Sequence, residues 1–402
     1  MKASIYAFTK KELEDWLVRE SFKRGNADPL WEGLYRKRIS CFHEMEGLPK
    51  GLAEKLEEEF QFPRFELVDL LESEDGTVKF LFRLKDGNMI ETVLMRHRFG
   101  SSVCVTSQVG CNMGCAFCAS GQLKKLRNLT VDEMVGQVVY VQRWLDREDR
   151  KLLGLSNSED RQASFAPDWL EENAEEGGAE TLATPSNEAS QLTHIVVMGI
   201  GEPFDNYDTI LSFLDIVMDV KGLCFAPRKI TVSTSGLAPR IRDFARTGHK
   251  VKLAISLHAS NDEVRSELMP VNRVYPLAVL FDALDFYIRE RGQRVSLEYI
   301  MIKGKTDSLE NAEELIDLVS DFGDKVMVNL IPYNPVDRSS FERSDPDQIE
   351  RFFDRLMKAG IFTFRRLERG GDVNAACGQL RSRQLSADAV RFETEEGKKG
   401  AV

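Results

Sequence analysis

The sequence predicts an α/β fold with a small helical accessory domain at the N-terminus. After about residue 99, short β-rich runs alternate with amphipathic stretches, and this alternation indicates βα units around a parallel sheet or barrel. The chain has 402 residues, 42% of them hydrophobic, which is enough for one large core and an appendage. In such folds the functional side chains gather at the carboxyl ends of the strands.

Four regions follow one another along the chain. Residues 1–62 predict the helical accessory domain, with helices over 10–20 and 52–60. Residues 63–98 predict a β-rich connector with turns at 74–76 and 86–87. The α/β domain is predicted over 99–370 and a C-terminal segment over 371–402. Its expected strands are 103–106, 194–198, 229–233, 253–257, 295–301, 326–331 and 361–364, and its expected helices are 131–144, 207–218, 239–247, 277–290, 309–322 and 348–358.

The formal net charge of -11 argues against a generic nucleic-acid binder, because binding phosphates requires clustered Lys and Arg. Much of the acidity lies in one segment, about 150–192, which lacks apolar periodicity and interrupts the α/β pattern after its first helix. We expect this insertion and the tail after about residue 386 to be disordered. Basic clusters occur at 36–38, 124–127, 365–369 and 381–383, and for any one of them alone a solvated face is the better interpretation.

The cysteine content favours metal or redox chemistry. No apolar run approaches the length of a bilayer, and the N-terminus lacks the core of a signal peptide, so we expect a cytoplasmic protein. In that compartment seven cysteines, three of them within eight residues, are more typical of a metal or redox site than of disulfides. The isolated Cys41 and Cys224 are predicted to be buried apolar residues.

Cys111, Cys115 and Cys118 form a C-x3-C-x2-C motif directly after the first strand of the alternating region. Three soft ligands on one tight loop can hold three irons of a [4Fe–4S] cluster and leave the fourth iron without a protein ligand. A structural zinc site that uses these thiols and Cys104 is the alternative. Such zinc sites usually take their ligands from two separated turns, which makes the cluster the better interpretation.

Polar residues follow several later strands. The run Gly199-Ile200-Gly201-Glu202-Pro203 ends a strand with paired glycines and one carboxylate, which suits close backbone approach and an ammonium group. Hydroxyl, imidazole and amide side chains occur at 233–236, 256–258 and 329–334. In a barrel these strand ends would converge on one pocket, although each alone could be an ordinary turn or cap.

The cysteine motif, written C-x3-C-x-aromatic-C, resembles the signature of the radical S-adenosylmethionine (SAM) superfamily. Together with the runs 107–111, 201–203 and 375–380, it closely resembles the RlmN/Cfr family of RNA methyltransferases. The resemblance implies a partial (βα)6 radical SAM barrel and one [4Fe–4S] cluster held by Cys111, Cys115 and Cys118. It also implies two SAM molecules per turnover.

The same resemblance implies roles for further residues. Cys377 would take a methyl group from one SAM, and a radical from the second SAM would remove hydrogen from that S-methyl group, so that the methylene radical adds to an adenine carbon. Cys104 would then attack Cys377 and release the product as a disulfide forms, and Glu91 would accept the proton of the base carbon. The implied SAM contacts are Gly201, Glu202, Ser233, Ser256, Leu257, His258 and Asn334.

The implied partners are 23S rRNA, tRNA and an electron donor such as flavodoxin or ferredoxin, and we expect a monomer. The accessory domain and basic clusters would bind folded RNA mainly through shape complementarity and contacts with phosphates. The run 201–206 is closer to the RlmN type, which favours 2-methyladenosine over the 8-methyladenosine of Cfr-type enzymes, which give antibiotic resistance. The remaining alternatives are a radical SAM enzyme with another substrate and a non-catalytic, zinc-stabilised RNA-binding protein.

Overall fold

A ten-stranded sheet runs through the molecule in the order β14-β13-β12-β11-β10-β9-β6-β5-β4-β3. The computed structural model describes residues 2–45, 47–97, 100–152, 191–336 and 339–380. The strands from β6 to β14 pair in parallel, whereas β3, β4, β5 and β6 pair antiparallel. The strands of this sheet are β3 Glu66–Glu72, β4 Val78–Arg83, β5 Met89–His97, β6 Gly100–Cys104, β9 Leu192–Val197, β10 Ile230–Thr234, β11 Lys252–Ser256, β12 Val295–Met301, β13 Val326–Pro332 and β14 Thr363–Arg365.

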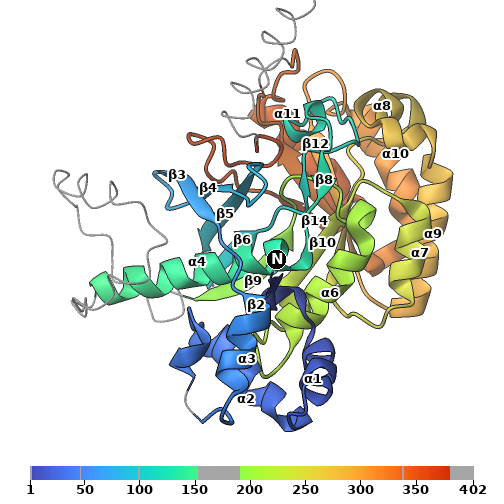
Figure 1. Ribbon diagram of the computed structural model, residues 1–402. Coiled ribbons are helices and arrows are strands. Elements are labelled where there is room, and N and C mark those ends of the chain that lie inside the picture. Colours follow the sequence, from blue (N-terminus) through green and yellow to red (C-terminus); the bar gives the residue numbers. More distant parts are fainter. Residues whose placement is uncertain (1, 46, 98–99, 153–190, 337–338, 381–402) are drawn as a thin grey trace, which may run out of the picture.

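Helices connect the parallel strands, as βα units require. Each of β6, β9, β10, β11, β12 and β13 is followed by a helix before the next parallel strand begins, which confirms the predicted α/β barrel-type fold. Figure 1 shows α6, α7, α9 and α10 outside the strands. The helices of this region are α4 Val131–Leu152, α6 Tyr207–Met218, α7 Ala238–Ala245, α8 Asp262–Leu268, α9 Leu277–Arg291, α10 Leu309–Val319 and α11 Pro346–Lys358.

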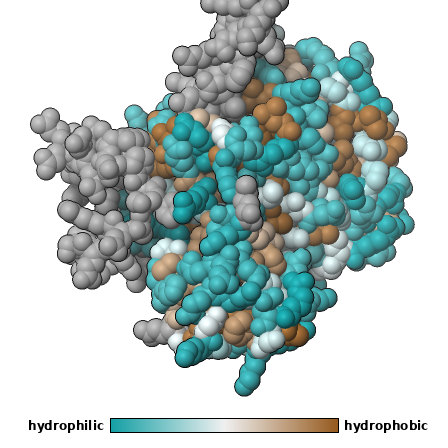
Figure 2. Space-filling model, viewed as in Figure 1, coloured by the Kyte–Doolittle hydropathy of each residue, from teal (hydrophilic) through white to brown (hydrophobic). Residues whose placement is uncertain are grey.

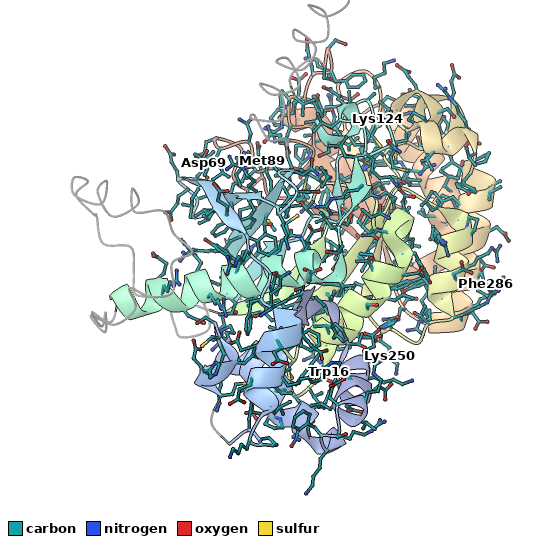
Figure 3. The ribbon with its side chains drawn as sticks, in the orientation of Figure 1. Trp16, Asp69, Met89, Lys124, Lys250 and Phe286 are labelled. Carbon is teal, nitrogen blue, oxygen red and sulfur yellow. The ribbon has the colours of Figure 1, made fainter. Side chains whose placement is uncertain are left out.

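The N-terminal region is helical and packs directly on the α/β region. Buried aromatic residues such as Trp16 and Trp31 belong to the same apolar core as the parallel strands, and the short helix η1, Ile5–Ala7, contacts α4. Figure 1 shows these blue helices beside α4 and α6, and Figure 3 labels Trp16 among them. The other elements here are β1 Ala3–Ser4, α1 Lys10–Arg19, η2 Arg24–Asn26, α2 Ala27–Glu32, η3 Gly33–Lys37, η4 Phe42–Glu44, α3 Leu52–Glu59 and β2 Phe60–Gln61.

The antiparallel strands β3, β4 and β5 continue the main sheet, because β5 pairs with β6. This arrangement brings side chains of the 63–98 region to the edge of the parallel strands. The face in Figure 2 is mainly hydrophilic, with hydrophobic residues in small groups. In the described part of the chain, no helix combines the length and apolar character needed to cross a bilayer.

The structure adds elements that the sequence pattern did not predict. Helix α4 ends at Leu152 instead of about residue 144. The short α8 begins after Asn261, whose side chain accepts a hydrogen bond from the Val264 N–H at 2.9 Å, and a seven-residue helix is too short to show periodicity. A two-strand hairpin, β7 Gln108–Val109 and β8 Arg127–Asn128, is also new. Most of the predicted acidic insertion and the predicted disordered tail lie outside the described residues.

The remaining short helices are η5 Ser120–Gln122, η7 Pro203–Asn206, η8 Pro227–Lys229, η9 Pro270–Arg273 and η10 Ser320–Lys325. Helix η7 follows the carboxyl end of β9, whereas η8 directly precedes β10 and lies at its amino end.

Candidate active site

The cysteine loop follows β6, and the β7–β8 hairpin closes its base. The Cys111 N–H donates to the Leu123 carbonyl at 3.0 Å. Gly110 has φ +76°, and a Cβ there would lie 2.3 Å from the Lys124 carbonyl oxygen, so a side chain at this position would collide with backbone. The loop is therefore held in a tight turn at its first cysteine.

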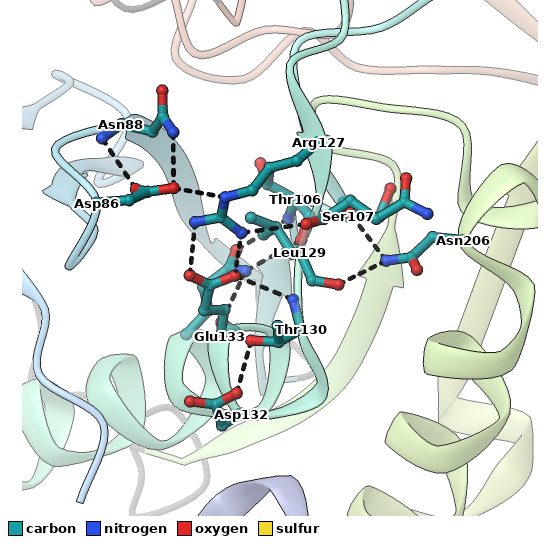
Figure 4. Close-up of polar contacts among 12 residues, drawn as sticks. Asp86, Asn88, Thr106, Ser107, Arg127, Leu129, Thr130, Asp132, Glu133 and Asn206 are labelled. Atoms are coloured by element: carbon teal, nitrogen blue, oxygen red, sulfur yellow. Dashed lines mark hydrogen bonds and ion pairs between the residues drawn. The ribbon is translucent and has the colours of Figure 1, made fainter. Parts of the chain in front are cut away.

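Arg127 connects this hairpin to two other elements through hydrogen bonds (Figure 4). Its guanidinium donates to Asp86, in the β4–β5 turn, at 2.6 Å and to both carboxylate oxygens of Glu133, in the first turn of α4, at 2.7 and 2.8 Å. Burial alone would raise the pKa of Asp86, but hydrogen bonds from Arg127 and Asn88 lower it to about 2. The base of the cysteine loop is thus tied to the sheet and to α4.

Cys111, Cys115 and Cys118 line one cavity at the carboxyl ends of the parallel strands. Burial raises the pKa of Cys111 to about 12 and also raises the pKa values of Cys115 and Cys118. A cation that binds the thiolates must displace these protons. Three thiols that face one cavity from one loop match the donor set of a [4Fe–4S] cluster with one open iron.

The zinc alternative needs Cys104 as a fourth ligand beside the three thiols of the loop. The four thiols do not line one cavity. Cys111 and Cys115 line the cavity of the cysteine loop, Cys104 lines a smaller cavity beside it, and Cys118 lines both.

The Gly201–Glu202 turn lies against the start of the cysteine loop. Gly201 has φ +110°, and a Cβ there would lie 2.6 Å from Gln108 Cβ. The side-chain oxygen of Gln108 accepts the Glu202 N–H at 2.9 Å. The buried carboxylate of Glu202 accepts the Ser235 N–H at 2.7 Å and the Phe204 N–H at 2.9 Å, and burial raises its pKa. This carboxylate therefore joins the ends of β9 and β10 at the wall of the cavity.

The other predicted SAM contacts divide into two groups. Ser233, Ser256 and His258 line the cavity of the cysteine loop together with Gly201 and Glu202. Leu257 is fully buried in the apolar core, and Asn334 lines a neighbouring cavity. The imidazole of His258 packs edge-on against the Phe117 ring at 4.7 Å, and burial lowers its pKa to about 3. The residue has φ +59°.

Arg265 is a residue of this region that the sequence pattern did not reveal. Its buried guanidinium donates to the carbonyl oxygens of Leu257 at 3.0 Å, Ser235 at 2.8 Å and Ser256 at 3.2 Å. It also donates to the Asn272 side chain at 2.7 Å, and burial lowers its pKa to about 10. Arg265 therefore ties the ends of β10 and β11 together behind the cavity. It stands on the unpredicted helix α8, and no sequence motif marks it.

Glu298 and Arg366 form an ion pair in the lining of this cavity. The Glu298 carboxylate accepts the Asn329 amide and the Ser296 hydroxyl, each at 2.7 Å, and lies 3.7 Å from the Arg366 guanidinium. The negative charge of an ionised Cys377 raises the pKa of Arg366, and Glu298 adds to this effect. Both Glu298 and Arg366 line the cavity of the cysteine loop, although the sequence pattern indicated only a basic cluster at 365–369.

Cys377 and Gly378 of the C-terminal segment line this cavity. Cys377 lines three cavities: the cavity of the cysteine loop, the neighbouring cavity that Asn334 lines, and a small cavity that Cys104 lines. The Asn334 amide donates to the Cys377 carbonyl oxygen at 3.2 Å, and the Ala119 N–H donates to the Gly378 carbonyl at 2.8 Å. Cys377 thus stands where the three cavities meet.

Cys104 ends β6 and lines the small cavity together with Cys377. Burial raises the pKa of Cys104 to about 12, and the charge of an ionised Cys377 acts in the same direction. All seven cysteines are free thiols in this structure. Cys224 is exposed and Cys41 is half-buried, so the prediction that both are buried was wrong. Cys224 lies in the loop between α6 and η8, and Cys41 directly precedes η4.

Glu91 lies on β5 with a buried side chain, 3.4 Å from the Lys79 ammonium on β4. The Lys79 Nζ also donates to the carbonyl oxygen of Asn374 at 3.2 Å. The structure therefore brings Glu91 next to the loop that carries Cys377. No motif indicated Lys79, because its partners come from distant parts of the chain.

Several basic residues of the predicted RNA-binding clusters have acidic partners within the chain. Arg38 pairs with Asp146 at 2.7 Å, and Lys125 pairs with Asp205 at 2.5 Å. Arg365 and Arg369 pair with Glu350 and Asp75, respectively, and the cluster at 381–383 lies outside the described residues. A basic run in the sequence is thus partly neutralised in the fold.

Comparisons with known proteins agree on one family. A family model described as "Radical SAM superfamily" matches residues 175–319. A "probable dual-specificity RNA methyltransferase RlmN" of Streptococcus suis is 46% identical over 389 residues, 96% of this chain and 95% of the relative. A relative of the same name from Shouchella clausii is 45% identical over 95% of this chain and 97% of its own length. The crystal structure of a radical SAM methyltransferase from Sphaerobacter thermophilus has a TM-score of 0.80 and 39% identity, and covers 94% of this chain and 99% of that one.

Proposed function

Because the chain belongs to the RlmN family of radical SAM RNA methyltransferases, we propose that it forms 2-methyladenosine in 23S rRNA and tRNA through an S-methyl group on Cys377. The observation that carries this proposal is the position of Cys377, where the cavity of the cluster cysteines meets that of Cys104. A carrier sulfur at this point can reach the radical source, the substrate and the resolving thiol.

Cys111, Cys115 and Cys118 would hold the [4Fe–4S] cluster, and the cavity next to them would hold SAM. When bound, one SAM would supply a methyl group, and the cluster with the second SAM would supply a carbon-centred radical. Glu202 supports the amino end of SAM, because each of its carboxylate oxygens keeps accepting capacity beyond the one backbone N–H that it receives. We propose the same pocket for Gly201, Ser233, Ser256 and His258, with Leu257 and Asn334 contributing at its edges.

Cys377 then serves as the methyl carrier. Its thiolate would take the methyl group of one SAM, so that an S–CH3 bond forms on Cys377 as the S–CH3 bond of the sulfonium breaks and S-adenosylhomocysteine leaves. This step is needed because an adenine C2 carbon is not a nucleophile toward SAM. The Arg366 guanidinium lines the same cavity as Cys377. Asn334 holds the Cys377 backbone at 3.2 Å while the sulfur faces the cavity.

Glu91 and Cys104 complete the reaction on the base. After the methylene radical of Cys377 has added to the adenine carbon, the adduct must give up one electron, which the oxidised cluster, when bound, would accept. The Glu91 carboxylate takes the proton of that carbon. The Cys104 thiolate then attacks the Cys377 sulfur, so that an S–S bond forms and the S–CH2 bond breaks; its electron pair stays with the base and takes up a proton to complete the methyl group. The small cavity shared by both cysteines supports this last step.

The partners follow from the same proposal. Folded rRNA and tRNA would be bound by the N-terminal helices and the remaining basic residues, mainly through shape and phosphates. A flavodoxin or ferredoxin would supply electrons, and we expect a monomer that works in the cytoplasm.

The test is mass spectrometry of digested rRNA and tRNA after anaerobic incubation with the iron-reconstituted protein, SAM and a reductant. We expect 2-methyladenosine with the wild-type chain and none with Cys377→Ala, whose cluster content should equal that of the wild type. Formation of 8-methyladenosine would support the Cfr-type alternative instead. An intact cluster without any methyladenosine would overturn the proposal and indicate a different substrate.

A further inference from the structure

Lys79 is a buried cation between two parts of the site. Its side chain is 9% exposed, and its ammonium lies 3.4 Å from the Glu91 carboxylate and 3.2 Å from the Asn374 carbonyl oxygen. A buried ammonium is costly unless it is paired and hydrogen-bonded. Both of its partners belong to the chemistry proposed above, since Glu91 is the proton acceptor and Asn374 lies in the loop that carries Cys377.

We propose that Lys79 is a positioning residue that couples the proton acceptor to the methyl carrier. When the Cys377 loop is docked, Lys79 binds its backbone at Asn374 and at the same time holds Glu91 as a carboxylate. The Glu91 carboxylate is therefore in position to accept a proton when the Cys377 sulfur is in place. This inference rests on the proposed function, and it assigns a role to a residue that no motif marks.

The loop has other anchors, so Lys79 is not needed merely to hold it. The Ser73 hydroxyl donates to Asp372 at 2.6 Å, and the Gly370 N–H donates to Asp75 at 3.2 Å. These contacts fix the loop to the β3–β4 turn. An apolar side chain in place of Lys79 alone would leave the buried Glu91 carboxylate without this ion pair, and an uncompensated buried charge is strongly unfavourable. A cation here is better explained by the charge that it places beside Glu91.

Other charged or titratable groups face this region from each packed element. Strand β3 contributes Asp69, which pairs with Leu81, the cross-strand neighbour of Glu91; Figure 3 labels Asp69 at this edge of the sheet. It therefore lies two strands from Glu91, about 10 Å away. Strand β4 also contributes Arg83 and β6 contributes Cys104. Arg366 follows β14, and Cys377 lies in the C-terminal segment. Lys79 is the group whose ion pair with Glu91 the structure defines.

The experiment compares Lys79→Met, Lys79→Gln and Lys79→Arg with the wild type in the full-length, cluster-reconstituted protein. Three quantities are followed between pH 6 and 9, roughly the range in which a perturbed carboxylate titrates. They are S-methylation of Cys377 by intact-protein mass spectrometry, the covalent protein–RNA adduct on denaturing gels, and methyladenosine. Ser73→Ala is the matched control, because it loosens the same loop without touching Glu91.

We expect Cys377 methylation at the wild-type rate in the Met and Gln variants. The protein–RNA adduct should accumulate at low pH. The pH below which product formation declines should rise by about 1–3 units, because an opposite charge has been removed from beside the Glu91 carboxylate. Lys79→Gln keeps an N–H donor for Asn374 but has no charge, so it should behave like Lys79→Met. Lys79→Arg should restore the wild-type profile, and Ser73→Ala should lower the rate without moving the profile.

An unchanged profile in Lys79→Gln, or the same profile change in Ser73→Ala, would overturn the role of Lys79 while leaving the proposed function intact. If Lys79→Met does not fold, as judged by its cluster content, the pH profile of Lys79→Gln is compared with that of the wild type instead. A wild-type protein that makes neither adduct nor methyladenosine would overturn the proposed function itself, and this inference with it.

Discussion

Cys104 and Cys377, which lie in the first parallel strand and in the C-terminal segment, line the same small cavity. The charge of Cys377 also acts on Cys104. This proximity is what resolution by disulfide formation requires.

Cys104→Ala should trap a covalent adduct between the protein and its RNA. Radical addition from Cys377 remains possible in this variant, but no thiol is available to release the product. Denaturing gels with labelled RNA measure the adduct, and Cys104→Ala combined with Cys377→Ala is the control that should give none. Recovery of free, unmodified RNA from the single variant would argue against Cys104 as the resolving thiol.

Replacing any one of Cys111, Cys115 and Cys118 by Ala should remove most of the bound iron and sulfide. Two remaining thiols cannot supply the three ligands that the cluster needs. Iron and sulfide analysis after anaerobic reconstitution checks this. Cys224→Ser, at an exposed site away from the cavity, should retain the full content. Equal losses in Cys224→Ser would show that the assay reports general instability.

Gly201→Ala should weaken SAM binding and stability more than Gly248→Ala. Both glycines have positive φ, +110° and +83°, but a Cβ at Gly201 would lie 2.6 Å from Gln108 Cβ, whereas none of the described atoms lies within 4 Å at Gly248. The conformational cost alone is about 1–2 kcal/mol, and Gly201→Ala adds the clash. Calorimetric titration with SAM measures the effect on SAM binding, and urea unfolding measures the effect on stability. Equal effects would mean that the contact with Gln108 relaxes freely.

Arg265→Met should destabilise the protein by about 3 kcal/mol or more, since each buried polar group left without a partner costs about 1–3 kcal/mol. The variant leaves the carbonyls of Leu257, Ser235 and Ser256 without this donor. Urea unfolding measures the loss. Arg289→Met is the control, because Arg289 forms an exposed pair with Asp285 and such pairs contribute about 0–1 kcal/mol. Similar losses in both would contradict the role of Arg265.

The stability of the fold should decrease as pH falls from about 6.5 toward 4 in part because of His194. Burial lowers the pKa of His194 from 6.5 to about 4, and the charges of Lys229 and Lys252 add to this. In this window the unfolded chain binds more protons at His194 than the folded chain, so protonation favours unfolding. Urea unfolding of His194→Gln at several pH values should show a smaller decrease. A slope equal to that of the wild type would exclude His194 as a contributor.

Much of the α/β region was predictable because its signals are local. The β-rich runs between amphipathic helices became the strands β9 to β14 with their helices, and a parallel strand buried on both faces reads as a short apolar run. The cysteine loop and the polar strand ends were also visible in the sequence, and most of them line one cavity. The short α8 and the β7–β8 hairpin were missed because elements of this length carry no periodic pattern.

By itself the sequence determined the ligand loop, the order of the βα units and the residue types at the strand ends, since each depends on neighbours along the chain. Only the tertiary structure decided that Lys79 lies between Glu91 and Asn374, that Arg265 ties β10 to β11, and that Cys377 stands where three cavities meet. These relationships join segments far apart in sequence. A single sequence does not encode such distances in any local pattern; they follow from how the whole sheet and its helices pack.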